Sequence, residues 1–513
     1  MSNRAERRPG ARLSRRDFVR LASAGGAAAA VAGIARPHSL LGMTGSASPA
    51  PAGGGTDIPG FGQDGSALRI LPEVHPNDLT LRGEELLAHI GDGIEAPSWL
   101  LNGSLPSPLI RVRKGERFRV DLENDLPDNL ILHWHGLTPP EDMDGHPRYA
   151  VRRGRSYRYD FTVENRAGTY WYHSHTHHKV GKHAYKGIGG LLIVEDDEEA
   201  ALELPSGDRE IPIILQDRRM EGHDTPSYSN PDTLEGILGD EPFGNGIRRP
   251  RLQVETALYR FRILNGSNAR IFRLARDDGR KLVLIGNDGG LLDRPAEMEY
   301  IDLAPAERVD LLVDLRDLKA GDRLKLYSRA FHIAGGLATP ERMHRQGHPL
   351  ELLTLEVDRE VEDPSPIPGR LLPLPNLPDP KDSVGERSFV FTSDRDMHTR
   401  TMSVHQINGL SYQMDRIDER VPFGETEIWS FINENQFAHP VHLHATHFRV
   451  LSREGGRGQV MPWERGLKDT VLVHPEETVK VAVRFSAHPG LFLLHCHNLE
   501  HEDVGMMLNI LVE

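Results

Sequence analysis

The single cysteine of the chain, Cys496, lies within a group of side chains that are typical copper ligands. It stands between His495 and His497, and His501 and Met506 follow shortly after. A thiolate with imidazole and thioether partners is the donor set of a blue copper electron-transfer site. Neighbouring side chains on a strand point to opposite faces, so Cys496 would face one metal centre and the two flanking histidines another. We therefore predict two metal centres joined by a short covalent path.

Three His-x-His pairs upstream supply further ligands for the second centre. On a strand, residues two apart share a face, as ligands of adjacent ions require. Neutral imidazole binds copper well. One such pair occurs often by chance, but three pairs and a His-Cys-His in one chain favour metal binding over structural histidines. The pairs are His133 and His135, His173 and His175, and His442 and His444, the last preceded by His439.

These four motifs resemble those of the multicopper oxidases, in the bacterial laccase-like branch with three cupredoxin domains. The resemblance covers roughly residues 66 to 513. It implies an all-β fold of three cupredoxin-like Greek-key β-sandwich domains. It also implies four copper ions per chain, one of type 1, one of type 2 and a type 3 pair.

The resemblance further implies which residues hold each ion. The thioether of Met506 would be a weak axial donor, from which we expect a low to middle reduction potential. The type 1 ligands would be His439, Cys496, His501 and Met506; the type 2 ligands His133 and His442; and the type 3 ligands His135, His173 and His497 on one ion and His175, His444 and His495 on the other.

Two carboxylates complete the expected catalytic set beside Cys496. Asp144 follows His135 by nine residues and resembles the family's aspartate next to the copper cluster. Glu502 is adjacent to His501 and resembles the acid that supplies protons for dioxygen reduction. A carboxylate near metal ions can keep a pKa that suits general acid work. The alternatives are an ordinary turn aspartate and a solvated glutamate.

An internal repeat predicts the domain organisation. Eighteen residues separate Gly115 from His133, and eighteen separate Gly424 from His442, with a similar pattern between them. The second half of the pattern also repeats, with Ser174 in the place of the cysteine. The first and last domains are therefore expected to be copies of one sandwich, and only the last can hold the thiolate copper.

Between these copies, residues 206–360 carry short alternating runs that predict a third sandwich without a His-x-His pair. Residues 361–383 are rich in proline and predict an extended linker. The expected domains are thus 66–200, 206–360 and 384–513. Because ligands come from both ends of the chain, we expect the cluster between the first and last domains, with the middle domain as a spacer.

Residues 1–45 resemble a twin-arginine export signal with a flexible lead-in. Arg15 and Arg16 precede an Ala/Gly-rich run that is too short and too polar to span a membrane. We expect cleavage between Ala35 and Ala50, export by the twin-arginine machinery to the periplasm or beyond, and no stable membrane anchor.

The formal net charge of −14 argues against nucleic acid and anionic membranes as partners. Residues 1–40 hold eight arginines and two acidic residues, so the processed chain would be near −20. That charge would favour cationic or neutral reductants, although solubility explains it equally well.

The main functional hypothesis is a laccase-like oxidase that couples one-electron oxidation of phenols or aromatic amines to four-electron reduction of O2 to water. A cuprous-ion oxidase is an alternative. Such relatives carry Asp and Met just before the His-Pro-x-His-x-His motif, where this chain has Asn435 and Phe437. Bilirubin oxidases share the motifs. A copper-free cell-envelope scaffold would have lost the ligands, which this chain keeps.

The remaining histidines are interpreted as residues without a metal-binding role. Surface positions are expected for His177, His178, His183, His344 and His348, and packing beside the copper-binding strands for His405 and His447. Residues 331–350 are the candidate for a loop that borders the reductant pocket.

Overall fold

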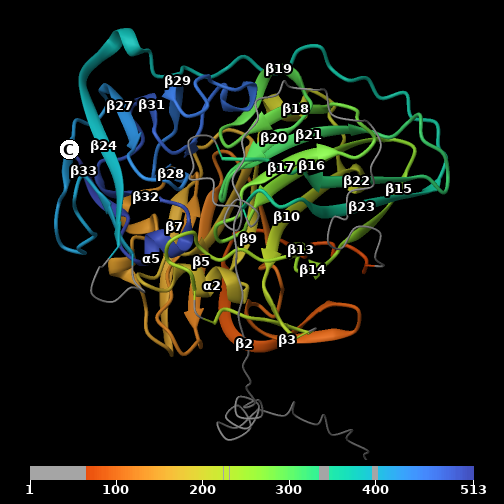
Figure 1. The fold of residues 1–513 in the computed structure, drawn as a ribbon, viewed down its shortest axis with the longest axis horizontal. Helices are drawn as coiled ribbons and strands as arrows, with labels where there is room; N and C mark the ends of the chain where they lie inside the picture. Colours follow the sequence, from red (N-terminus) through yellow and green to blue (C-terminus); the bar gives the residue numbers. More distant parts are fainter. Residues whose placement is uncertain (1–64, 223, 230, 334–345, 396–402) are drawn as a thin grey trace, which may run out of the picture. The chain divides into compact units, whose positions relative to one another are not determined.

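The structure, a computed structural model, describes residues 65–513 except 223, 230, 334–345 and 396–402. The expected export signal therefore lies outside the described residues. Six of the sheets group by residue range into three pairs, and each pair forms a sandwich (Figure 1). The predicted all-β fold is confirmed. In the described part of the chain, no helix is long and apolar enough to cross a bilayer.

The first sandwich joins a sheet of order β1-β4-β9-β8-β6 to one of order β3-β2-β5-β7. The alternation along strand β5 explains why the two sheets pack face to face. Phe118, Val120 and Leu122 are buried, while the residues between them are charged and face outward. The ring of Phe118 meets Trp134 of the other sheet edge-on at 4.6 Å. The elements are β1 (Glu73–Val74), β2 (Leu79–Gly91), β3 (Ile94–Leu101), β4 (Leu109–Arg113), β5 (Arg117–Asn124), β6 (Leu132–His135), β7 (Arg155–Thr162), β8 (Gly168–Ser174), α2 (Val180–Lys186), β9 (Gly189–Glu195) and α3 (Asp197–Ala200).

The middle sandwich has sheets of order β14-β13-β10-β16-β21-β18-β19 and β15-β23-β22-β17-β20, with a small separate hairpin of β11 and β12. Its strands are β10 (Glu210–Arg218), β11 (Met220–Glu221), β12 (Thr225–Pro226), β13 (Glu241–Gly244), β14 (Ile247–Arg248), β15 (Arg251–Glu255), β16 (Leu258–Asn265), β17 (Phe272–Arg276), β18 (Leu282–Asn287), β19 (Gly290–Met298), β20 (Ile301–Leu303), β21 (Arg308–Asp314), β22 (Arg323–Ser328) and β23 (Leu350–Arg359).

The last sandwich has sheets of order β25-β24-β27-β31-β29 and β26-β33-β32-β28-β30. Between β23 and β24 the chain forms only one short 3-10 turn, Pro380–Asp382. The elements are β24 (Ser383–Arg395), β25 (Ser403–Ile407), β26 (Glu419–Val421), β27 (Thr426–Asn433), β28 (His439–Leu443), β29 (Phe448–Gly455), β30 (Thr470–Val473), β31 (Glu477–Val483), β32 (Gly490–Cys496), α5 (Leu499–Asp503) and β33 (Met507–Val512).

One asparagine turn recurs in all three sandwiches. Asn124, Asn265 and Asn433 each end a strand. Each side-chain oxygen accepts the backbone N–H two residues on, and each amide nitrogen donates to two carbonyls. Nine residues after each asparagine stand, in chain order, His133, Leu274 and His442. The middle sandwich therefore repeats the scaffold but has an aliphatic side chain at the ligand position.

A buried ion network fixes the middle sandwich to the first. Arg260 and Arg262 on β16 bind Glu199 of α3 at 2.9 and 2.7 Å. Both arginines also bind Asp310 of β21, at 2.6 and 3.1 Å. Each charge has partners, which is the condition under which buried ions are tolerated. The network thus sets how these two sandwiches face each other.

Candidate metal centres

The thiolate set predicted from the sequence comes together at the end of β32. The Sγ atom of Cys496 lies 3.3 Å from Nδ1 of His439 and 3.6 Å from Nδ1 of His501. The two Nδ1 atoms lie 3.1 Å from each other. All three side chains are buried, and Met506 belongs to the same buried core. Three donor atoms therefore converge on one point.

The outer nitrogens of these two imidazoles are held by other groups. Nε2 of His501 donates to the carbonyl of Leu234 at 3.0 Å, and Nε2 of His439 meets the Asn435 side chain. The Nδ1 lone pairs are thereby directed at the sulfur. Burial raises the pKa of the Cys496 thiol, so the metal-free sulfur is protonated. A bound metal ion would deprotonate it.

The eight remaining histidines form a second cluster, at the ends of paired strands. In the first sandwich His133 of β6 lies opposite His173 of β8, and in the last sandwich His442 of β28 lies opposite His495 of β32. Their Nε2 atoms meet across the two sandwiches. His133 and His442 approach to 3.3 Å, and His175 and His495 to 3.4 Å. The second cluster therefore lies between the first and last sandwiches, where the sequence predicts it.

The chemistry of this cluster fits metal ions. Burial is the main cause that holds the pKa of six of its histidines well below 6.5, and repulsion among the rings and, for His135, from Arg308 adds to it, so these imidazoles are neutral. Three triads have nitrogens within 4.8 Å of one another: His133 with His442 and His444, His133 with His135 and His173, and His175 with His444 and His495. Nδ1 of His135, Nε2 of His173 and both nitrogens of His497 lack a hydrogen-bond partner among the described residues. Buried, unpartnered lone pairs that converge are what copper ligation requires.

Asp144 joins the histidines of two sandwiches. Its Oδ2 accepts a hydrogen bond from Nδ1 of His444 at 2.7 Å, and its backbone carbonyl accepts one from Nδ1 of His133 at 2.7 Å. The next residue, Gly145, has a φ of +88°, and a Cβ there would lie 2.1 Å from the carbonyl oxygen of Leu132. Only glycine lets this turn pack on β6, and the turn places Asp144 among the ligands.

Glu502 is buried, so its interpretation as a solvated glutamate is wrong. Its carboxylate lies 3.2 Å from Nδ1 of His495 and 3.5 Å from Nε2 of His175. Neither oxygen has a partner with hydrogen-bond geometry among the described residues. An acid without fixed donors, beside two candidate ligands of one ion, is positioned to exchange protons there.

Sequence reasoning missed a third carboxylate, Asp469. Its Oδ1 accepts a hydrogen bond from Nε2 of His135 at 3.0 Å, and its carbonyl accepts one from Nδ1 of His442 at 2.8 Å. Arg308 of the middle sandwich donates to both carboxylate oxygens, at 2.8 and 2.5 Å. Burial raises the pKa of Asp469, but the attraction of Arg308 outweighs it and holds the pKa below its usual range. The middle sandwich is therefore more than a spacer, because it fixes the partner of two candidate ligands.

Comparison with known proteins decides the family. Two family models, each described as "Multicopper oxidase", match residues 86–199 and 384–513. The chain is 30% identical over 468 residues to the laccase of Bacillus subtilis (strain 168), which covers 80% of this chain and 89% of the laccase. The chain belongs to the multicopper oxidases. It is also 32% identical over 419 residues to the bilirubin oxidase of Albifimbria verrucaria, covering 79% of this chain and 71% of that protein.

A solved structure of another multicopper oxidase supports the assignment. McoA from the hyperthermophile Aquifex aeolicus superposes with a TM-score of 0.80 at 33% identity, covering 88% of this chain and all of McoA. Multicopper oxidases bind four copper ions, as type 1, type 2 and a type 3 pair. The two donor clusters of this member are compatible with that content, so the cofactor prediction is confirmed.

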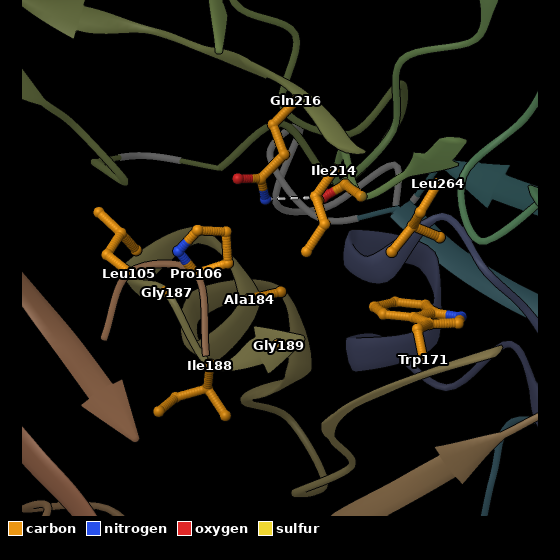
Figure 2. Close-up of a pocket in the computed structure, with 11 residues that line it drawn as sticks. Leu105, Pro106, Trp171, Ala184, Gly187, Ile188, Gly189, Ile214, Gln216 and Leu264 are labelled. Carbon is orange, nitrogen blue, oxygen red and sulfur yellow. Dashed lines mark hydrogen bonds between the residues drawn. The ribbon is translucent and has the colours of Figure 1, made fainter. Parts of the chain in front are cut away.

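A small cavity lies behind the histidine cluster of this multicopper oxidase, between the first and middle sandwiches. Figure 2 shows the Trp171 ring at one side and Ile214 and Leu264 nearby. The space of about 20 Å³ holds roughly one water molecule. The Trp171 ring stacks on His173 at 4.2 Å, so it separates the cavity from that ligand. The cavity is too small for a phenol.

The histidines of this multicopper oxidase that were expected at the surface differ in burial. His177 is half-buried, His178 exposed and His348 half-buried, while His344 and much of the candidate loop 331–350 lie outside the described residues. The prediction that His183 is a surface residue is wrong. Its buried ring bonds through Nδ1 to the hydroxyl of Ser174 at 2.7 Å, because the hydroxyl that replaces the thiol needs a partner.

The packing predicted for His405 and His447 is confirmed. The ring of His405 stacks on that of His501 at 4.1 Å. Nε2 of His447 lies 3.7 Å from Oδ2 of Asp469. His405 thus contacts a candidate ligand directly, and His447 contacts a carboxylate that holds one.

Proposed function

We propose that this laccase-like multicopper oxidase removes single electrons from phenols or aromatic amines and delivers them to O2. Four electrons and four protons convert one O2 into two molecules of water. The observation that carries the proposal is the position of Cys496, whose sulfur faces one donor set while both neighbours in the chain face the other. A covalent path of a few bonds therefore joins the two centres.

The proposed ligands follow the resemblance, and the geometry of each set supports them. Both members of the proposed type 2 pair direct Nε2 at each other, and the type 1 histidines direct Nδ1 at the sulfur. We assign His439, Cys496, His501 and Met506 to type 1; His133 and His442 to type 2; and His135, His173 and His497 with His175, His444 and His495 to the type 3 pair.

Bound copper would supply the one-electron redox steps and the reduction of O2. The side chains of the protein do the rest. Cys496 and its backbone link the sites, and the buried surroundings exclude water from the cluster. Asp144 and Asp469 accept hydrogen bonds from ligand imidazoles and so fix their orientation. We assign proton delivery at the cluster to the carboxyl of Glu502, since it contacts His175 and His495.

A cuprous-ion oxidase is the second candidate. The Asn435 side chain is hydrogen-bonded to Nε2 of the His439 imidazole. A neutral amide in this position offers no negative charge to attract Cu⁺. Bilirubin oxidation uses the same donor sets. The scaffold alternative has the least support, because every expected ligand is present and the donor atoms converge.

We also propose export by the twin-arginine route, with a periplasmic or secreted protein as the result. The supporting observation is the Arg15-Arg16 pair before a weakly apolar run. The domain limits 66–200, 206–360 and 384–513, with a linker at 361–383, are part of the same proposal. The boundaries of the sheets are compatible with them.

The test is to purify the processed protein, load it with copper, and measure metal content, the visible spectrum and O2 uptake with a panel of reductants. We expect about four copper ions per chain, phenol-driven O2 uptake, and an intense blue band that Cys496→Ser abolishes. Uptake with Cu⁺ alone would favour the cuprous-ion alternative. A protein without copper and colour would overturn the oxidase proposal.

A further inference from the structure

The end of β8 in the first sandwich has the same local geometry as the end of β32 in the last. Ser174 is the last residue of β8 and Cys496 the last of β32, and each stands between two proposed cluster ligands. Each side chain accepts the backbone N–H two residues on at 3.4 Å, from Thr176 in the first sandwich and Asn498 in the last. The two strand ends therefore differ mainly in the atom that they present, an oxygen or a sulfur.

His183 of α2 occupies the place that the proposed type 1 ligand His501 occupies in the last sandwich. The carbonyl of each histidine accepts the N–H of the residue five positions on, Ile188 or Met506, at 3.0 Å. Nδ1 of each histidine also faces the side chain at the strand end, at 2.7 Å from the serine oxygen and 3.6 Å from the cysteine sulfur. The first sandwich thus keeps one imidazole of the thiolate site in its original orientation.

The other two donor positions of the thiolate site are aliphatic in the first sandwich. Ile188 stands in the place of Met506. Leu130 precedes its His-x-His pair by three residues, as His439 precedes the pair in the last sandwich. A thiolate-type copper ion therefore has no donor set here, and a hydrogen bond between the remaining two side chains takes its place.

The hydrogen bond between His183 and Ser174 has a defined direction. Oδ2 of Asp128 lies 3.5 Å from Nε2 of His183, and a carboxylate there favours the tautomer with its proton on Nε2. Nδ1 is then an acceptor and receives the serine O–H, while the serine oxygen accepts the N–H of Thr176. The buried hydroxyl of Ser174 is bonded both as donor and as acceptor, so it fixes the strand end to α2.

The two ligands beside Ser174 depend on this attachment. Neither His173 nor His175 donates a hydrogen bond to a carboxylate among the described residues, whereas His444 donates one to Asp144. Nδ1 of His173 reaches the carbonyl of Ser174 at 3.0 Å, and Nδ1 of His175 has no partner in the described part of the chain. The orientation of both rings therefore follows from the position of the strand that carries them.

We propose that Ser174 and His183 are positioning residues for the proposed copper ligands His173 and His175, an inference that rests on the proposed function. Neighbouring side chains of a strand point to opposite faces, so the hydroxyl holds the strand from the face opposite the two imidazoles. A metal ion would hold Cys496 in the same way in the last sandwich. The first half of the cluster is therefore fixed without any metal, and the last half is completed by the thiolate copper.

The test removes the hydroxyl with Ser174→Ala. The matched control is Ser328→Ala, because Ser328 is also buried, also ends its strand, and also accepts a backbone N–H, from Arg273 at 3.0 Å. It belongs to the middle sandwich, which holds no proposed ligand. A second pair of variants changes the acceptor. His183→Leu removes it and keeps a large apolar side chain, whereas His183→Asn places an amide oxygen near the position of Nδ1.

The first measurement uses copper-free protein. Amide hydrogen exchange, followed by mass spectrometry, is measured for a peptide that spans residues 173–176. We expect at least tenfold faster exchange in Ser174→Ala and His183→Leu, because the strand end loses its attachment to α2. Exchange in His183→Asn and Ser328→Ala should stay within threefold of the parent.

The second measurement uses copper-loaded protein and follows the release of copper to a chelator, by elemental analysis and by the visible spectrum. Loss of a group that orients a metal ligand typically weakens metal binding about 10- to 100-fold. We expect Ser174→Ala and His183→Leu to release cluster copper at least tenfold faster while the blue band persists. His183→Asn should restore most of the retention, which a loss of general stability would not explain.

The outcomes separate this inference from the proposed function. Equal exchange in Ser174→Ala and Ser328→Ala, or equal copper release from His183→Leu and His183→Asn, would overturn the positioning role. A parent protein that binds no copper at the cluster would overturn the oxidase proposal instead. The exchange of residues 173–176 in copper-free protein would still show whether the hydroxyl fixes the strand end.

Discussion

Arg308 and Asp469 form a fully buried, two-pronged ion pair although 161 residues separate them in the chain. Arg308 belongs to the middle sandwich and Asp469 to the last. The same carboxylate accepts a hydrogen bond from His135 of the first. All three sandwiches therefore meet at one side chain that touches a proposed copper ligand.

Replacing Arg308 by lysine should damage the copper cluster while sparing the thiolate site. Lysine keeps the charge but cannot bind both oxygens of Asp469, so His135 and His442 lose a fixed partner. We expect at least tenfold slower O2 reduction and an altered paramagnetic resonance of the type 2 copper, with the blue band retained.

Arg453→Lys is the matched control for that experiment. Arg453 is also buried and pairs with Glu464 and Glu477, away from the proposed copper ligands. Loosening such a pair should lower stability by up to about 3–5 kcal/mol in either variant. Equal effects of the two variants on O2 reduction would show that Arg308 is merely structural.

The effect of a substitution at Asp144 on copper retention should depend on whether the new side chain can still accept a hydrogen bond from His444. Asn keeps an acceptor oxygen, whereas Ala removes it and leaves the imidazole free to turn. We expect Asp144→Ala to lose cluster copper on dialysis and Asp144→Asn to retain most of it. Elemental analysis of copper per chain checks this. Equal retention in the two variants would argue against an orienting role.

Glu502→Gln should slow O2 reduction without affecting electron uptake. The amide keeps the size of the side chain but cannot donate the proton that the carboxyl exchanges beside His175 and His495. We expect 10- to 100-fold slower reoxidation of the fully reduced enzyme by O2, with copper content and blue band unchanged. Glu500→Gln is the control, since this buried acid contacts Tyr228 and Asn268 instead.

The free energy of unfolding should depend on pH through the buried neutral histidines. His474 is a buried histidine that is not a proposed copper ligand, so its contribution can be measured separately. Burial and then Arg457 hold the pKa of His474 well below 6.5. Below pH 6.5 the unfolded chain therefore binds one more proton than the folded chain, and stability falls as pH falls.

The measurement is the free energy of unfolding of copper-free protein between pH 8 and pH 5. His474→Asn should reduce the decline by up to about 1.4 kcal/mol per pH unit below pH 6.5. Above pH 7.5 the difference between variant and parent should not vary with pH. An unaltered slope would mean that His474 is protonated in the folded protein.

The ligand motifs could be predicted from the sequence because their information is local. A strand places residues two apart on one face, so His-x-His and His-Cys-His sort their side chains before any tertiary contact forms. The recurring asparagine turn adds a constant interval of nine residues to His133 and His442. The fold followed from the same repeats.

The supporting residues could not be predicted because their partners are distant in the chain. No sequence pattern around Arg308 indicates that it pairs with Asp469. No motif identifies Leu234 either, because it contributes only a backbone carbonyl to His501. The sequence predicts a surface position for His183 only because that is the default for a histidine outside the ligand motifs. Its burial depends on the serine hydroxyl that replaces a thiol.

The proline-rich connection between β23 and β24 has a further consequence. Most of it is exposed or half-buried, and it pairs with no strand. A protease cut there would yield two polypeptides. Each would carry four of the eight histidines of the second cluster, and these histidines contact one another across the interface between the first and last sandwiches. Metal binding would hold the pieces together by mass action. The buried pair of Arg308 with Asp469 also crosses the cut, so the nicked enzyme would travel as one particle on a sizing column even after a chelator removed the metal.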